Sequence, residues 1–387
     1  MRVGLVTWWF NRGQATVMRT IRRALDDLGH ETHVLARPTE SGFDRPGYVA
    51  TDGVWDQPGV TVASRSDIPV DEYLAWAARH RLEAVLVFQN LQVEALDALR
   101  RAGIVTAGTY MWEAFGPDEA GRVAPVLDRV FALNRPSAER YRDLGLEVGE
   151  ALPFALPPDG STPGAAPPRS DTRVRFLFPA GYLRARKPLG AVVEGFRRGA
   201  PADATLTIKA QVPVRSGDLT VPSAWRDLLR RHDEHSGPLT GPVVTDPRIR
   251  IVTDDLSHPQ FVDLMRRHDV VVGVSRWEGL GLHLYECDLL GIPLVLNRME
   301  PYVDFARDGG RCLLVDSKVI GRRAQGIDVH EPDIDSLAAA FSRLSTRTAV
   351  EERFGPPRST VERWHGFVAA VGTLVADLEA RRPDGAR

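Results

Sequence analysis

The stretch that decides the fold runs from Ser275 to Leu296 and reads SRWEGLGLHLYECDLLGIPLVL. An apolar run at 270–274 precedes it and predicts a buried strand. The stretch itself predicts a loop with Gly279 and Gly281, a helix that ends near Gly291, and a second apolar strand opened by a proline. This order of strand, loop, helix and strand indicates an α/β domain.

Two carboxylates, Glu278 and Glu286, bracket the loop that leads into this helix. Backbone N–H groups at a helix N-terminus favour an anion, and Gly281 lets the backbone approach it closely. The carboxylates repel phosphate but accept hydrogen bonds from hydroxyls. The pattern therefore suits a sugar nucleotide. The alternative is a loop acid and a surface helix residue with no ligand, and the complete order of features favours the site.

Glu278 and Glu286 with their seven intervening residues, followed by Gly291-Ile-Pro293, resemble the signature of retaining glycosyltransferases of the GT-B fold, in particular glycosyltransferase family 4. The resemblance implies an α/β protein with two Rossmann-like, doubly wound domains that face across a cleft, and a C-terminal helix that crosses back. It implies transfer of a hexose or pentose from a nucleoside diphosphate sugar to an acceptor hydroxyl. We expect a small-molecule or specialised-metabolite acceptor, because no basic, aromatic membrane-binding helix stands out.

The chain has 387 residues, which fits two domains. Residues 153–170 are rich in Pro, Gly, Ala and Ser and predict a linker. We therefore expect an acceptor domain at 1–160, a donor domain at 171–360, and a terminal helix at 361–380 that packs back on the first domain.

The composition excludes several classes of protein. A formal net charge of −2 gives no electrostatic case for nucleic acid, and no apolar run is long enough to span a membrane. The N-terminus lacks the pattern of a signal peptide. Cys287 and Cys312 form no disulfide framework, so we expect a reduced, cytoplasmic setting. Nothing indicates the oligomeric state.

A basic loop, 181–188, follows the first strand predicted in the second domain. It resembles the family loop in which an arginine and a lysine hold the donor diphosphate. Lys187 matches the lysine, whereas Tyr182 stands at the arginine position, so Arg184 or Arg186 is expected to supply that charge. The alternative is a solvated basic turn. The resemblance assigns catalysis to Glu278 and Lys187, and donor binding to Glu286, Gly281, Leu282, Arg186, Arg184, Thr253 and Gly13.

The first half opens with a strand at 3–9, a polar loop, and a helix predicted over 16–28. It carries no G-x-G-x-x-G fingerprint. In enzymes of this fold the first loop faces the ligand, which makes Gly13 and Arg12 candidates, and an ordinary turn is the alternative. Asn90, Tyr110 and Glu113 follow predicted strands and are acceptor-side candidates, with structural roles as the alternative. The histidine common in family 4 at such strand ends is absent between His80 and His232.

No Asp-x-Asp motif or histidine cluster predicts a metal site, and we expect no cofactor beyond the nucleotide sugar as co-substrate. Two other functions stay open. One is another enzyme of this fold, such as a pseudo-glycosyltransferase that joins cyclitols. The other is a non-catalytic module that binds a sugar nucleotide.

Overall fold

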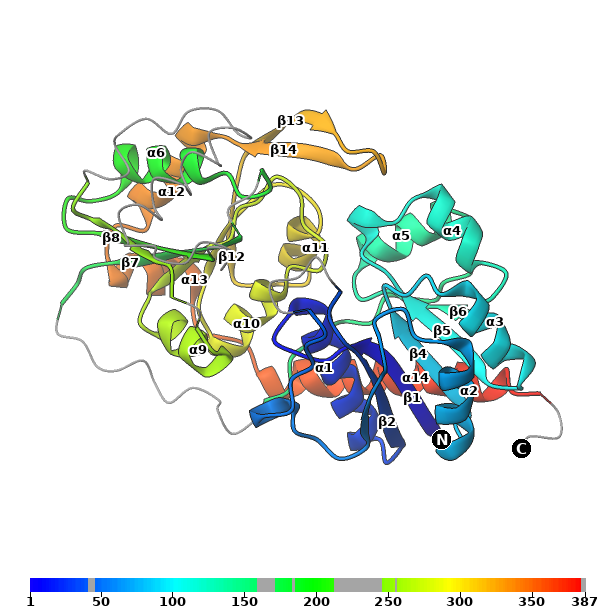
Figure 1. The fold of residues 1–387 in the computed structure, drawn as a ribbon. Coiled ribbons are helices and arrows are strands. Elements are labelled where there is room, and N and C mark those ends of the chain that lie inside the picture. The colour runs from blue at the N-terminus through cyan, green and yellow to red at the C-terminus, as the bar shows by residue number, and fades with distance from the viewer. Residues whose placement is uncertain (41–45, 159–170, 183–184, 212–245, 255, 384–387) are drawn as a thin grey trace. The chain divides into compact units, whose positions relative to one another are not determined.

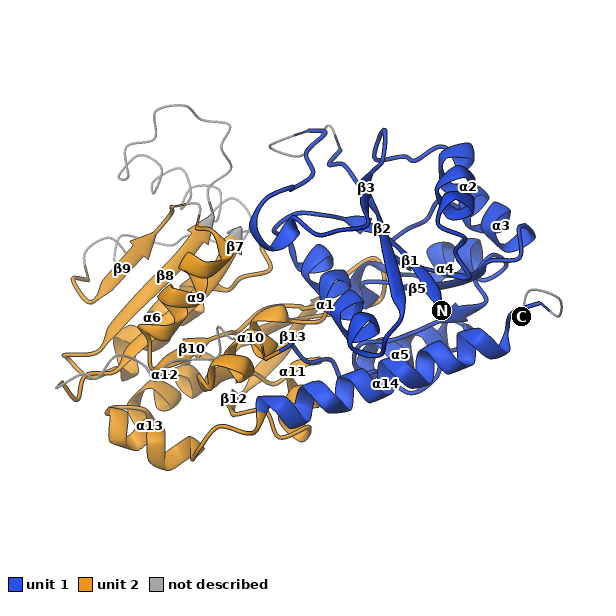
Figure 2. Cartoon of the chain, turned by 90° about the horizontal axis from the view of Figure 1, so that it is seen from below, with its two compact units in different colours: residues 1–157, 360–387 blue, residues 158–359 orange. Residues whose placement is uncertain are grey.

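The computed structural model describes residues 1–40, 46–158, 171–182, 185–211, 246–254 and 256–383 (Figure 1). The chain forms two compact units, one of residues 1–157 with 360–387 and one of residues 158–359 (Figure 2). Arg184 lies outside the described residues. No helix in the described ranges has the length and apolar character needed to cross a membrane.

Unit 1 contains a six-stranded parallel sheet in the order β3-β2-β1-β4-β5-β6. The central strands are near-continuous apolar runs, as expected of strands that are covered on both faces. The strands are β1 (Arg2–Trp8), β2 (Glu31–Arg37), β3 (Val60–Val62), β4 (Ala84–Phe88), β5 (Val105–Thr109) and β6 (Arg129–Val130). The helices are α1 (Gly13–Asp27), α2 (Val70–Arg79), α3 (Val93–Arg101), α4 (Pro117–Val123), α5 (Arg135–Asp143) and α14 (Thr360–Ala380).

The C-terminal helix α14 belongs to unit 1 although the chain reaches it from unit 2 (Figure 2). It packs on α1, where Trp364 Nε1 donates a 3.0 Å hydrogen bond to Asp27 Oδ2. The rings of Phe154 and Phe367 meet edge to face at 5.3 Å. Apolar and polar contacts thus hold α14 against α1 and the segment around Phe154.

Unit 2 repeats the strand arrangement of unit 1. Its parallel sheet has the order β12-β11-β10-β7-β8-β9, so both sheets show the order 3-2-1-4-5-6 of doubly wound domains. The strands are β7 (Arg175–Tyr182), β8 (Thr205–Gln211), β9 (Ile249–Val252), β10 (Val270–Val272), β11 (Leu294–Asn297) and β12 (Cys312–Val315). The helices are α6 (Leu189–Gly199), α9 (His258–Arg266), α10 (Leu282–Leu290), α11 (Tyr302–Arg307), α12 (Ile334–Arg343) and α13 (Arg347–Phe354). The predicted doubly wound α/β fold class is confirmed.

Two features differ from the sequence-based expectation. Helix α1 begins at Gly13 instead of residue 16, so Gly13 is its first residue and not part of the preceding loop. An antiparallel hairpin, β13 (Ser317–Arg322) and β14 (Asp328–Pro332), lies between β12 and α12 and was not predicted. Its turn contains Gly326 with φ of 80°, a conformation that favours glycine.

Candidate functional site

The predicted loop and helix occur in unit 2 as the sequence indicated. Helix α10 has Gly281 as its N-cap and Gly291 as its C-cap, both in the left-handed region with φ of 74° and 68°. Glycine reaches this region at little cost, which explains both helix boundaries. Leu282 is the first helical residue, so the N–H groups of Leu282 and His283 have no partner in the helix itself, whereas Leu284 N donates to Gly281 O at 2.8 Å. The loop thereby presents an anion-favouring helix end directly after Glu278.

Gly281 is needed for space as well as for conformation. A Cβ at this position would lie 2.9 Å from Leu284 Cδ1 and 3.4 Å from Glu278 Cγ. We expect Gly281→Ala to lower the free energy of unfolding by about 1–3 kcal/mol, because the backbone is strained and a side chain must shift. Urea denaturation of both proteins measures this difference.

Gly321→Ala is the matched control for Gly281→Ala. Gly321 lies in the same unit, its φ is not in the left-handed region, and no described heavy atom lies within 4 Å of its Cβ position. We expect this substitution to change the free energy of unfolding by less than about 0.5 kcal/mol. Equal effects of the two substitutions would contradict the structural reason given for Gly281.

Glu278 lies at the centre of a polar cluster. Its side chain is 10% exposed and forms ion pairs with Arg186 and with Lys187, whose Nζ is 3.4 Å from Glu278 Oε2. Ser275 Oγ donates to the same carboxylate oxygen at 3.4 Å, and Gly279 N donates to the other at 3.3 Å. Tyr302 OH lies 3.4 Å from Glu278 Oε2. The structure thus brings together the predicted residues Glu278, Arg186 and Lys187.

The cations determine the charge of this cluster. Burial alone would raise the pKa of Glu278, but Arg186 and Lys187 outweigh burial and lower it to about 2. Burial lowers the pKa of Lys187 to about 8, although Glu278 opposes this. Burial and the nearby Lys187 lower the pKa of His283 to about 3, so its imidazole is neutral at pH 7. The cluster therefore holds one ionised carboxylate and two cations.

Glu286 occupies a different environment on α10. It is buried, and burial raises its pKa to about 7. His258, the first residue of α9, has its Nε2 3.9 Å from Glu286 Oε1. No hydrogen bond to the Glu286 carboxylate is found among the described residues. A buried carboxylate in this state can accept hydrogen bonds from ligand hydroxyls.

The remaining donor-side candidates lie at element ends. Thr253 is half-buried in the loop after β9, and Gly13 is exposed at the start of α1 in unit 1. Ser275, Tyr302 and His258 were not predicted as site residues. Tyr302 also donates to Gly273 O at 2.6 Å, so it connects α11 to the loop after β10. The contact between Tyr302 and Glu278 joins residues 24 positions apart, so it leaves no local signal in the sequence.

The acceptor-side candidates of unit 1 have mixed environments. Asn90 has no exposed surface and donates to Tyr73 OH at 2.8 Å, while Tyr110 is buried and donates to Asn90 O at 3.1 Å. These internal bonds favour structural roles for both residues, the alternative that the sequence left open. Glu113 is half-buried in a short helical turn, Trp112–Ala114. Arg12 lies over the Phe10 ring at 5.6 Å.

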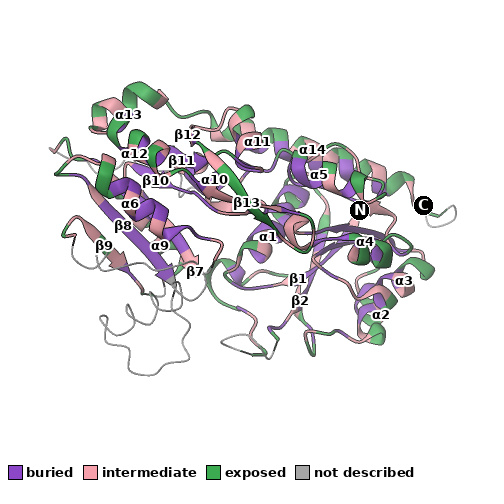
Figure 3. Ribbon diagram, turned by 90° about the horizontal axis from the view of Figure 1, so that it is seen from above, coloured by how far each residue is buried: buried purple, intermediate pink, exposed green. Residues whose placement is uncertain are grey.

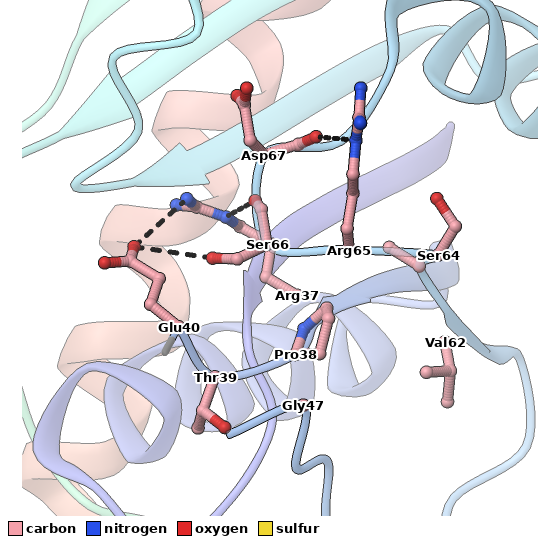
Figure 4. Close-up of a pocket in the computed structure, with 11 residues that line it drawn as sticks. Arg37, Pro38, Thr39, Glu40, Gly47, Val62, Ser64, Arg65, Ser66 and Asp67 are labelled. Atoms are coloured by element: carbon pink, nitrogen blue, oxygen red, sulfur yellow. Dashed lines mark hydrogen bonds and ion pairs between the residues drawn. The ribbon is translucent and has the colours of Figure 1, made fainter. Parts of the chain in front are cut away.

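A hollow of about 750 Å³ opens in unit 1 beside the ends of β2 and β3 (Figure 4). Arg37 Nε donates to Ser66 O at 3.0 Å, and Arg65 Nε donates to Asp67 O at 2.9 Å. Their guanidinium groups thus bond to the wall of the hollow. None of the four acceptor-side candidates lines it.

No group of three or more His, Cys, Asp or Glu side chains in the described part of the chain is placed to hold a metal ion. Cys287 and Cys312 are free thiols, and burial raises the pKa of both. Neither thiol is therefore a ready nucleophile at neutral pH.

Comparison with solved structures gives matches over almost the whole chain. Sucrose-phosphate synthase from Thermosynechococcus elongatus is 15% identical with a TM-score of 0.62, and the match covers 98% of this chain and 99% of that one. A trehalose-6-phosphate synthase, studied for glycosyl transfer with retention, is 13% identical with a TM-score of 0.61, covering 99% and 100%. Anabaena HepE in complex with UDP and glucose is 12% identical with a TM-score of 0.59, covering 98% and 99%.

These similarities show the GT-B fold. No family model matches the chain, and a search of curated proteins found no match.

Proposed function

We propose that this chain is a retaining glycosyltransferase of family 4 type, which transfers a sugar from a nucleoside diphosphate sugar to an acceptor hydroxyl. The observation that carries the proposal is the cluster of Glu278, Arg186 and Lys187 beside the N-terminus of α10. It combines cations and backbone N–H groups for a diphosphate with a carboxylate for hydroxyls. The GT-B fold supports the proposal by analogy, because a fold alone does not define an activity.

The ion pairs of Glu278 suggest how a donor enters. A diphosphate offers Arg186 and Lys187 new anionic partners, and charge-assisted hydrogen bonds to phosphate oxygens are strong. As the cations turn to the diphosphate, the Glu278 carboxylate becomes available to the sugar hydroxyls. The donor would thus replace the ion pairs of Glu278 with two contacts of its own. Its diphosphate would bind Arg186 and Lys187, and its sugar hydroxyls would bind Glu278.

The chemical step requires stabilisation of the departing diphosphate. The bond between the anomeric carbon and the phosphate oxygen breaks, and the diphosphate keeps the electron pair. The acceptor oxygen forms the new bond, and its hydroxyl proton passes to the departing phosphate oxygen. Lys187 and the N–H groups at Gly281 and Leu282 would stabilise the charge that develops on the leaving oxygen. We propose that the acceptor enters on the face from which the diphosphate leaves, which retains the anomeric configuration without a protein nucleophile.

Thermal-shift measurements with millimolar UDP, GDP, ADP and dTDP test the nucleotide site, because a ligand that binds the folded state raises the Tm. Turnover assays with the corresponding sugar nucleotides then test transfer, and we expect activity to persist in EDTA. Donor hydrolysis without a glycoside product would favour a different enzyme of this fold. Binding without any turnover would favour a non-catalytic module, and no Tm shift with any nucleotide would contradict the proposal.

Glu286 gives donor binding a pH dependence. We propose that its carboxylate accepts hydrogen bonds from the ribose hydroxyls, for which it must be ionised. Because burial raises its pKa to about 7, donor affinity should fall by up to about tenfold per pH unit below pH 7 and level off between pH 7 and about pH 8. Titration calorimetry with the sugar nucleotide measures this, since a phosphate diester lacks the second ionisation near pH 6.

Two variants serve as controls for the pH dependence. Glu286→Gln should bind the donor weakly, with an affinity that is flat between pH 5.5 and about pH 8. His258→Ala removes the imidazole 3.9 Å away and should leave the break near pH 7, because burial is what raises the pKa of Glu286. If donor affinity changes with pH by the same slope in wild type and in Glu286→Gln, a group other than Glu286 causes the pH dependence.

A further inference from the structure

The hairpin β13–β14 lies outside both six-stranded sheets and contributes little to the core of unit 2. Most of β13 is exposed, including Val319 at 54% and Ile320 at 52% (Figure 3). An isolated two-stranded hairpin is at best marginally stable in water. Its contacts with the rest of unit 2 therefore indicate what holds it and what it supports.

These contacts converge on the residues just before Glu278. His330 N donates to Arg276 O at 2.8 Å. The Glu331 carboxylate accepts from both Nε and Nη2 of Arg276, the latter at 3.2 Å. The Arg323 guanidinium lies 4.6 Å from the centre of the Trp277 ring. A bidentate arginine–carboxylate pair fixes both position and orientation.

Arg276 also contacts the basic loop that carries the two cations. Its Nη1 donates to Ala185 O at 2.7 Å, and its backbone N donates to Arg186 O at 2.8 Å. The Arg276 side chain is 12% exposed, so these bonds form with little competition from water. One residue thus connects the hairpin, the loop with Arg186 and Lys187, and the loop with Glu278.

We propose that hairpin β13–β14 is a positioning element, and that the Arg276–Glu331 pair holds the two cations in register with Glu278. The inference rests on the proposed function, since it assigns the pair to the donor site. Arg276 and Glu331 act through Arg186 and Lys187 and touch no substrate. The requirement is physical: a charge displaced by about 1 Å from a reacting group can cost about 100-fold in rate.

Glu331→Ala tests the proposal, with Asp328→Ala as the matched control. Asp328 pairs with Arg322 Nε at 2.9 Å in the same hairpin but has no described contact with either loop. We expect Glu331→Ala to lower kcat by about 30- to 100-fold with a small change in donor KM, and Asp328→Ala to stay within about twofold of wild type. If the hairpin only stabilised the fold, Glu331→Ala and Asp328→Ala would have the same kcat. Calculated per folded molecule, the kcat of both variants would then equal that of the wild type.

A double-mutant cycle sharpens the test. If the pair acts through Lys187, Glu331→Ala should lower kcat by less than about fivefold in a Lys187→Met background. The two substitutions then remove the same contribution of Lys187 to kcat. An unchanged cost in that background would overturn the inference.

Amide hydrogen exchange provides a readout without activity. Glu331→Ala should speed exchange in peptides covering 185–189 and 274–280, and Asp328→Ala should not. Unchanged exchange in Glu331→Ala would overturn the inference. If the wild type binds no nucleotide but exchange responds as expected, the proposed function fails while the structural coupling stands.

Discussion

Lys187→Met is expected to lower kcat by about 100- to 1,000-fold, the usual effect of removing one group that stabilises developing negative charge. The Lys187 side chain is 4% exposed, and methionine fills a similar volume without the charge. Arg186 remains as a partner for Glu278, so the carboxylate is not left without a counter-charge. We therefore expect the Tm to change little while turnover is lost. Steady-state kinetics and differential scanning calorimetry measure the two effects.

The pH profile separates a charge effect from a packing effect. Burial lowers the pKa of Lys187 to about 8, so the cation is present below pH 8 and is lost above it. The wild-type kcat/KM for the donor should fall above pH 8, because kcat/KM reports the ionisation of the free enzyme. The residual activity of Lys187→Met should lack this limb. Lys318→Met, on the exposed hairpin strand β13, is the control and should behave as wild type. Near wild-type turnover in Lys187→Met would contradict the assigned role.

The sequence predicted those parts of the site that depend on local chemistry. Gly281 and Gly291 mark both ends of α10 because each occupies a left-handed conformation that other residues rarely adopt. Apolar runs such as 270–274 predicted buried strands, and alternation of strands with helices predicted the doubly wound sheets. The proximity of Lys187 and Glu278, 91 residues apart, came from the family resemblance and not from periodicity.

The parts that were missed depend on the direction of side chains and on distant contacts. Asn90 follows a strand, as predicted, but a position in sequence does not say that its amide points inward to Tyr73. The Arg276–Glu331 pair joins residues 55 positions apart. The hairpin itself had a local signal, two short strand-forming segments around Gln325-Gly326.

Glu278→Gln is expected to have the largest combined effect. The amide cannot neutralise Arg186 and Lys187, and removing one partner of a buried ion pair costs about 3–5 kcal/mol. Arg186 is 37% exposed and can turn toward water, whereas Lys187 is 4% exposed and cannot, so we expect about 3 kcal/mol and a Tm lower by about 5–10 °C. Turnover should fall by at least about 100-fold, because the sugar hydroxyls lose their charged acceptor.

Ligand binding distinguishes the role of Glu278 in the donor site from a role in folding alone. A nucleoside diphosphate supplies the negative charge that Glu278→Gln lacks, so it should raise the Tm of the variant more than that of the wild type. The sugar nucleotide should stabilise the variant no more than the nucleotide does, since the contact with the sugar is gone. Glu194→Gln is the control: Glu194 pairs with Arg198 at 2.7 Å on the surface of α6, and its loss should cost less than about 0.5 kcal/mol. If the nucleotide stabilises Glu278→Gln less than it stabilises the wild type, Arg186 and Lys187 do not hold the diphosphate, and the exchange of partners on which the mechanism depends does not occur.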